Sequence, residues 1–153
     1  DAARGAQADG EVPALKGSWK LSLDIYVLSA DGALLDVCLL AAVAALQDAT
    51  LVLPAGEDEA AASSVPGRRL RLRCTPCALT CGAAADGRLV VDPGADEEPL
   101  LDSLAVAVLD EADAVLSFNK PGGGAVKASL LPQVLRAAQL RARDVRELLA
   151  SEG

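Results

Sequence analysis

The stretch "SADGALLDVCLLAAVAAL", residues 29–46, joins a polar turn to a long apolar segment that carries a single charged residue, Asp36. Asp31-Gly32 is typical of a tight turn, and residues 33–48 have the composition and length of a helix. Because this helix is apolar on nearly every side, we expect a sheet to cover one face and another element to cover a second.

The start of this helix raises the question of an anion site. The first N–H groups of a helix can bind a phosphate. The residues that follow the turn are Ala33, Leu34, Leu35 and Asp36, none of which is cationic or carries a hydroxyl. A carboxylate in the first turn complements the helix dipole itself and repels a phosphate. The sequence therefore predicts a turn here and no anion site.

Alternating apolar residues predict strands on both sides of this helix. The segment "WKLSLDIYVLS" (19–29) alternates well and is expected to be a strand. Asp86-Gly87 predicts a hairpin turn. Ser129 suits the cap of a final helix, 129–150, and Pro132 falls in its first turn. The order of elements predicts an α+β fold. Further strands are predicted at 69–74, 77–83, 88–92, 103–109 and 114–119, and the buried stripe of the final helix is predicted to be Leu131, Val134, Leu135, Ala138, Ala142, Val145 and Leu149.

The length of 153 residues suits one domain, with 52% hydrophobic and only 2% aromatic residues. Residues 1–17 have no periodicity and are expected to be a loose arm, and residues 55–67 a surface loop. No apolar run approaches the roughly eighteen residues of a membrane span, so no membrane association is expected. Methionine is absent, which indicates that residue 1 is not a translation start and that the chain can be part of a longer protein.

Histidine is absent, which disfavours histidine-based catalysis and metal ligation. The segment "CTPCALTC" places Cys74, Cys77 and Cys81 at spacings that a metal or an iron–sulfur cluster could use. The fourth ligand would have to be Cys38, within the apolar helix. Buried structural thiols are therefore favoured, a cysteine-ligated metal-binding module remains an alternative, and no cofactor is predicted.

The segment "PGGGAVKAS" is similar to a phosphate-binding loop, but Val126 precedes Lys127 where that motif has glycine. The glycine triplet is better explained by backbone conformation.

Taken together, several segments resemble the ribonuclease PH fold, and most closely the non-catalytic ribonuclease PH-like ring subunits of the eukaryotic RNA exosome. The segments are "ADGALLDVCLLAAVAAL", "RCTPCALTCG", "RLVVDPGADEEPLLDSLAVAVLDE" and "NKPGGG". The resemblance runs from Trp19 to the C-terminus and implies a partial domain over residues 18–153. It further implies a mixed sheet with packed helices, of which this chain has only the second half.

The resemblance also bears on catalysis. Phosphorolytic members of this family have Gly-Gly-Thr-Arg-Thr after the aspartate of the turn, and that segment binds the attacking phosphate. The arginine of that motif falls on Leu35, and its threonines fall on Leu34 and Asp36. The catalytic carboxylate of active members has no secure counterpart, although Asp102 lies in the right region. No catalytic residue is therefore predicted.

The implied function is that of a catalytically inert exosome ring subunit that supports 3′-to-5′ RNA processing and degradation, ribosomal RNA included. The implied partners are the other ribonuclease PH-like ring subunits, the cap subunits, the associated nucleases and single-stranded RNA in the assembled channel. The implied location is the nucleus, with the nucleolus, and the cytoplasm. A phosphate-dependent 3′-to-5′ exoribonuclease shares the fold and is the alternative enzyme.

The net charge of −8 argues against a free-standing nucleic-acid binder. Local basic patches nevertheless exist. On a strand, Arg69, Arg71 and Arg73 share one face and could contact RNA phosphates, and Lys120 and Lys127 flank the glycine triplet. Pairing with acidic residues of a neighbouring subunit, or simple solvation, explains the arginines equally well.

Overall fold

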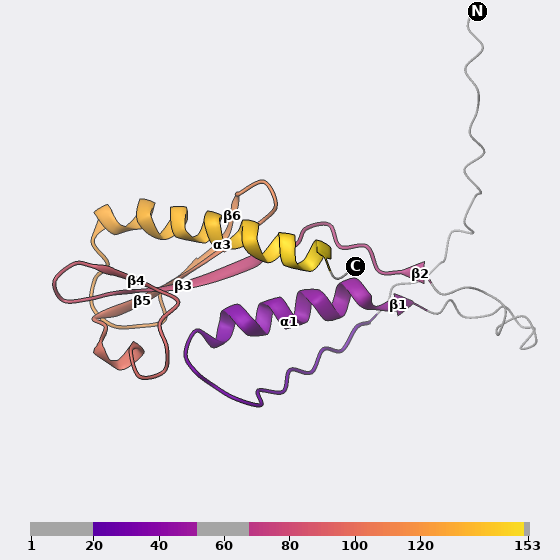
Figure 1. Cartoon of the computed structure of the whole chain (residues 1–153), viewed down its shortest axis with the longest axis horizontal. Coiled ribbons are helices and arrows are strands. Elements are labelled where there is room, and N and C mark those ends of the chain that lie inside the picture. Colours follow the sequence, from indigo (N-terminus) through magenta and orange to yellow (C-terminus); the bar gives the residue numbers. More distant parts are fainter. Residues whose placement is uncertain (1–19, 52–67, 152–153) are drawn as a thin grey trace, which may run out of the picture.

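The computed structural model describes residues 20–51 and 68–151, so the predicted arm (1–17) and surface loop (55–67) lie outside the described residues (Figure 1). The elements are α1 (Leu34–Asp48), β1 (Thr50–Leu51), β2 (Arg68–Arg69), β3 (Cys77–Ala83), β4 (Leu89–Val91), the 3₁₀ helix η1 (Glu98–Leu100), β5 (Ser103–Leu109), β6 (Val115–Asn119), the 3₁₀ helix η2 (Ala128–Leu130) and α3 (Leu131–Ser151).

The main sheet has the strand order β4-β3-β5-β6. Its centre is the pair β3 and β5, which align over their full length from Cys77 opposite Leu109 to Ala83 opposite Ser103. The hairpin turn predicted at Asp86-Gly87 is confirmed and joins β3 to β4, with Gly87 at φ 87°. Every strand pairing among the described residues is antiparallel. The mixed sheet that the resemblance implies is therefore corrected to an antiparallel sheet in the described part of the chain.

Helix α3 covers one face of this sheet. Its Val134 and Ala138 pack with Leu79, Cys81 and Ala107 in a fully buried cluster. Two details of the predicted helix are wrong. Ser129 lies inside η2, so it cannot take the non-helical conformation of a cap for α3. Leu131 is 37% exposed because it stands at the first residue of α3, where the helix begins beyond the sheet.

Helix α1 runs alongside β3 and is confirmed within one residue of its predicted start (Figure 1). Its Leu40 packs beside Cys77, Ala142 and Val145, and so contacts α3 as well as the sheet. The first turn of α1 is less covered, since Leu34, Leu35 and Val37 are exposed. Strand β3 and helix α3 are thus the elements of the described chain that pack against α1.

Two predicted strands are wrong. Residues 20–29 form no strand, because no neighbouring segment in the described part of the chain pairs with them. Of the strand predicted at 69–74, only Arg68–Arg69 pairs, as β2 with β1. Beyond it the exposure still alternates: Arg71 and Arg73 are exposed, and Leu70, Leu72 and Cys74 are partly buried. The sequence pattern thus correctly predicted which side chains of this segment are exposed, but not that most of the segment lacks a partner strand.

Candidate functional site

The turn before α1 is held tightly against a loop that is distant in sequence. Gly32 and Ala33 have positive φ values of 75° and 43°. A Cβ atom on Gly32 would lie 2.2 Å from the Pro93 carbonyl oxygen, so only glycine fits. The Asp31 carboxylate accepts a hydrogen bond from the Ala95 N–H at 3.2 Å. This turn therefore serves as a packed junction between α1 and residues 93–95.

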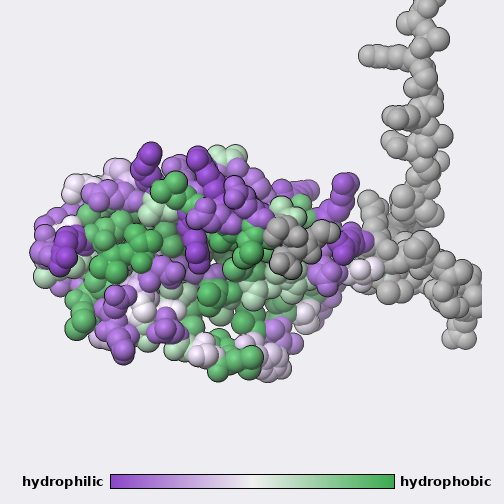
Figure 2. Space-filling view, in the orientation of Figure 1, coloured by the Kyte–Doolittle hydropathy of each residue, from purple (hydrophilic) through white to green (hydrophobic). Residues whose placement is uncertain are grey.

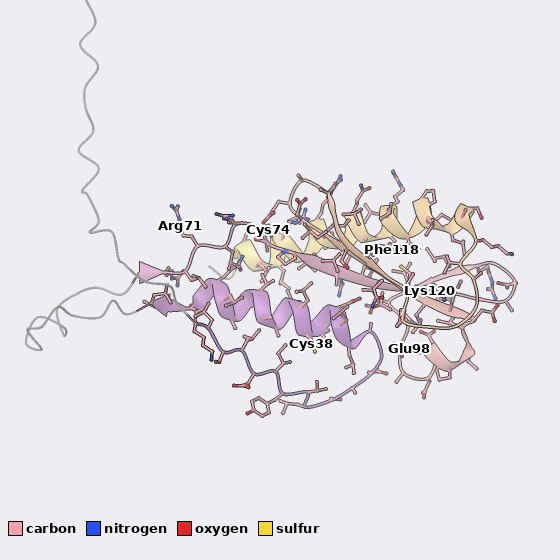
Figure 3. The ribbon with its side chains drawn as sticks, turned by 180° about the vertical axis from the view of Figure 1, so that it is seen from behind. Cys38, Arg71, Cys74, Glu98, Phe118 and Lys120 are labelled. Carbon is pink, nitrogen blue, oxygen red and sulfur yellow. The ribbon has the colours of Figure 1, made fainter. Side chains whose placement is uncertain are left out.

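A carboxylate of this same chain occupies the start of α1. The Ala33 N–H, at the N-cap, donates to Glu98 Oε1 at 2.8 Å. Glu98 begins η1, and the label in Figure 3 places it near the first turn of α1. An anion at this position satisfies a free helix N–H and complements the dipole. Because Glu98 already does both, the geometry agrees with the interpretation that the turn is not a phosphate site.

Asp36, the one charged residue in the middle of α1, has an internal partner. One of its carboxylate oxygens accepts the Thr80 N–H at 2.6 Å, and the other accepts the Thr80 hydroxyl at 2.8 Å. Burial raises the pKa of Asp36, while the two hydrogen bonds from Thr80 oppose that shift. Asp36 thus links α1 to Thr80 of β3 by hydrogen bonds, a structural role that explains why the helix carries this charge.

A cavity of about 250 Å³ lies between η1, the start of β5 and the glycine triplet. Asp102 lies at its exposed margin, and the buried Ser103 hydroxyl has no hydrogen-bond partner among the described residues. The ammonium group of Lys120 is bound to the carbonyl oxygens of Gly122 and Gly123, at 2.8 and 3.0 Å. The cavity is lined by apolar residues and two carboxylates and by no cationic side chain, which makes it poorly suited to phosphate. The lining residues are Glu98, Leu101, Asp102, Ser103, Leu104, Pro121, Gly122 and Gly123.

The five candidate RNA-binding residues do not form one surface. Arg71 and Lys120 lie toward opposite ends of the molecule (Figure 3). Arg69 pairs with Asp48 at 3.5 Å, and Lys120 is bound to its own loop. Arg71 and Arg73 are exposed without an ion pair or hydrogen bond in the described part of the chain. Lys127, the remaining candidate, precedes η2.

The four cysteines are free thiols. Cys77 and Cys81 are buried in β3, and burial raises the pKa of Cys81 to about 11, so that it is protonated at neutral pH. Within residues 20–51 and 68–151 no three possible metal ligands come together. No helix in the same ranges is long and apolar enough to cross a membrane.

Three comparisons identify relatives of the chain. The sequence profile of the 3′ exoribonuclease family, domain 1, matches residues 8–51. The exosome complex component Rrp42 of Thermococcus onnurineus is 30% identical over 127 residues, which are 82% of this chain and 46% of that protein. Rrp42 of Saccharolobus islandicus is 31% identical over 141 residues, 90% of this chain and 50% of the relative.

Solved exosome structures share the fold. The Archaeoglobus fulgidus exosome with RNA bound to the active site matches with a TM-score of 0.65 and 29% identity, over 78% of this chain and 44% of that one. An archaeal exosome core matches with a TM-score of 0.67 and 28% identity, over 80% and 47%.

The chain therefore has a ribonuclease PH-like fold and belongs with the ribonuclease PH-like proteins. More particularly, it is a relative of the Rrp42 exosome components, and it spans about half the length of those it matches. The assignment of this chain to the second half of the domain, and the eukaryotic origin, stay predictions.

Two site residues were missed by sequence reasoning. Glu98 was part of the resemblance, but no role followed from it, and Thr80 was not singled out. Both act through hydrogen bonds between residues that are 65 and 44 positions apart. A local sequence pattern carries no signal for such contacts. The lack of a capping side chain at Ala33 is only an indirect hint that another segment supplies the acceptor for the helix N-terminus.

Proposed function

We propose that this chain is a structural, catalytically inert subunit of an exosome ring that supports 3′-to-5′ RNA processing and degradation. The observation that carries the proposal is the internal Glu98 carboxylate on the Ala33 N–H, at the position where the resemblance implies phosphate binding in active members. Leu34, Leu35 and Asp36 follow it, so no side chain there can neutralise a phosphate.

The remaining charges around the helix start support inertness. Asp31 and Glu97 accept N–H groups of the 93–98 loop, and Asp36 is held by Thr80. A phosphate at the helix start would be repelled by these carboxylates, and Arg141, which lines a pocket with Asp36, is already paired with Asp92 at 4.0 Å. Asp102 at the cavity margin could act on a substrate only if an attacking phosphate were bound beside it.

The proposed partners are the other ribonuclease PH-like ring subunits, the cap subunits, the associated nucleases and single-stranded RNA. The relatives are exosome components, which supports this assembly, as does the structural match to an archaeal exosome core. If the source is a eukaryote, the proposed location is the nucleus, including the nucleolus, and the cytoplasm.

The enzymatic alternative is tested by incubating the purified chain with oligo(A) and inorganic phosphate and measuring the release of nucleoside diphosphate. We expect none, because no residue at the start of α1 can bind the attacking phosphate. The Asp102→Asn variant is the matched control. Release by the unmodified chain that disappears in this variant would show that the chain is a phosphorolytic enzyme and would overturn its assignment as an inert subunit.

The structural role has a separate test. After co-expression, the chain should co-purify with ribonuclease PH-like ring subunits. Native mass spectrometry should show one copy of the chain at each ring position that it fills. A chain that stays free of every ring subunit, while those subunits assemble among themselves, would contradict the proposed membership.

A further inference from the structure

A short strap of chain, residues 120–124, follows β6 and folds back on the start of β5. The Gly124 N–H donates to the Asp102 carbonyl oxygen at 2.8 Å, and Gly123 forms an isolated antiparallel bridge with Ser103. A Cβ on Gly123 would lie 2.3 Å from the same Asp102 oxygen, and the φ of Gly123 is 77°. Only glycine therefore lets the strap lie this close to β5.

The strap is one wall of the cavity of about 250 Å³ beside η1. Residues 121–123 line it, together with Glu98 and residues 101–104. The chain leads from the strap to the start of α3, at the left end of the molecule in Figure 1, and Figure 2 shows hydrophobic residues exposed among hydrophilic ones at that end. A movement of the strap would open the partly buried Leu101 and Leu104 of this cavity to solvent.

The side chain of Lys120 ties the beginning of the strap to its middle. Its ammonium group donates to the carbonyl oxygens of Gly122 and Gly123, at 2.8 and 3.0 Å. Although the chain has 22 acidic residues, none in the described part of the chain forms an ion pair with Lys120. Hydrogen bonds from a charged donor are stronger than those between neutral groups. The positive charge of Lys120 therefore acts on the strap itself.

The composition of the strap makes such a tie necessary. Three successive glycines, residues 122–124, lose more backbone entropy on ordering than other residues do. A Cβ on Gly122 would meet nothing within 4 Å, so no neighbour packs there. Apart from the two bonds from Lys120, the Gly124 N–H and the Gly123 bridge hold the strap to β5 in the described part of the chain.

We propose that Lys120 keeps this strap closed: its ammonium group holds residues 121–124 against the start of β5, and so closes the cavity on that side. Without the ammonium group, the strap should leave β5 by local opening while the sheet stays folded. The Asp102 N–H donates to the Ala83 carbonyl oxygen of β3 at 2.8 Å and should not take part in this opening. The inference does not rest on the proposed ring, so it can hold even if the chain joins no exosome.

The test compares amide hydrogen exchange of the full chain and of its Lys120→Met variant by NMR. Methionine is about as long as lysine but has no hydrogen-bond donor. The Gly124 amide should exchange about tenfold faster in the variant, because a hydrogen-bonded amide exchanges when its segment opens. The Asp102 amide, which is bonded to β3, should exchange at the same rate in both proteins.

A second measurement reports on the cavity. A neutral gadolinium chelate in solution broadens the methyl signals of the side chains that it can approach. In Lys120→Met, the methyl signals of Leu101 and Leu104 should broaden more than in the unmodified chain. The signals of Leu79 and Leu109, which are only 2% and 1% exposed in the core, should not change.

Lys127→Met is the matched control, because Lys127 follows the glycine triplet but makes no hydrogen bond to the strap in the described part of the chain. It should leave the exchange of the Gly124 amide unchanged. Gly123→Ala opens the strap by another route, because its Cβ would collide with the Asp102 oxygen while Lys120 stays in place. This variant should also accelerate exchange at Gly124.

Three results would overturn the inference. Unchanged Gly124 exchange in Lys120→Met would show that the backbone contacts alone hold the strap. Equal acceleration of the Gly124 and Asp102 amides would show that Lys120 stabilises the sheet as a whole. Equal effects of Lys120→Met and Lys127→Met would show a general effect of charge and no specific tie.

Discussion

At the scale of single residues, Gly32 is a position where the fold leaves no room for a side chain. Its φ of 75° is unfavourable for other residues, and a Cβ would lie 2.2 Å from the Pro93 carbonyl oxygen. The 93–95 loop would have to move, which would strain the Asp31 hydrogen bond to Ala95 as well. We expect Gly32→Ala to lower the free energy of unfolding by roughly 1–3 kcal/mol in urea titration.

Gly122 provides the matched control for this substitution. A Cβ there would have no neighbour within 4 Å, and its φ is not in the left-handed region. Gly122→Ala should therefore leave the urea midpoint nearly unchanged. Equal midpoints for the two variants would show that the close packing of the turn contributes nothing to stability.

The Asp36–Thr80 contact makes a second prediction. Asp36→Ala leaves the Thr80 N–H without an acceptor in a partly buried place, and should cost about 1–3 kcal/mol of unfolding free energy. Asp36→Asn keeps an acceptor for this N–H and should cost less. A double-mutant cycle with Thr80→Val measures the share of the hydroxyl, and purely additive losses would contradict the hydrogen bond to Thr80 Oγ1.

The pH dependence of that contact has a definite sign. Burial raises the pKa of Asp36 above its ordinary value of 3.8, so the folded state binds this proton more tightly than the unfolded state does. The corresponding stability is fully present below 3.8 and is lost as pH rises through the raised pKa. The stability of the unmodified chain minus that of Asp36→Asn should therefore fall over this window in acid urea titrations. A difference that rises would mean that the Thr80 hydrogen bonds outweigh burial.

At the scale of elements, the predictions that held are those with a strong local signal. The apolar segment of β5 and the Asp-Gly turn after β3 both gave the observed boundaries within one or two residues. The apolar run of α1 did so as well. In each of these cases, a partner element within the described chain covers the pattern.

The predictions that failed show what periodicity measures. Residues 19–29 and 69–74 alternate like strands, and the exposure of Arg71 and Leu72 alternates as well, yet neither segment pairs along its length. Alternation reports which side of an extended segment is apolar, whereas a strand also requires a neighbour. The antiparallel character of the sheet likewise depends on how segments meet and could not be predicted from any one of them.

The candidate site shows the same division. The side chains after the Asp31-Gly32 turn lead to the prediction that phosphate does not bind there, and this stays a prediction. That Glu98 fills the helix start depends on a contact between segments 65 residues apart, which only the folded chain shows. The prediction that phosphate does not bind thus rests on local chemistry, whereas the Glu98 contact that supports it is formed only by tertiary packing.

At the scale of the whole molecule, an acidic chain of net charge −8 has exposed cations without a partner near one end. The four-arginine segment was predicted to have three arginines available, but Arg69 is paired with Asp48. Arg71 and Arg73 remain, spaced about 7 Å apart along an extended backbone if it follows strand geometry. Lys120, bound to two carbonyl oxygens, would have to break both bonds to reach RNA.

Arg71 and Arg73 are the two arginines of this segment without an ion pair in the described part of the chain, so the RNA-contact prediction is tested first on them, in an assembled ring that contains this chain. Arg69, Lys120 and Lys127 stay predicted candidates. Changing both to alanine should weaken single-stranded RNA binding. It should also reduce the slope of log affinity against log salt by about 1.4, since each phosphate contact on a single strand contributes about 0.7. Arg88→Ala is the control, because Arg88 is held by Asp86 at 2.6 Å and lies in the turn before β4, away from Arg71 and Arg73 in the sequence. If the double variant disrupts the ring, these arginines belong to a subunit interface, and if affinity and slope do not change, they contact only solvent.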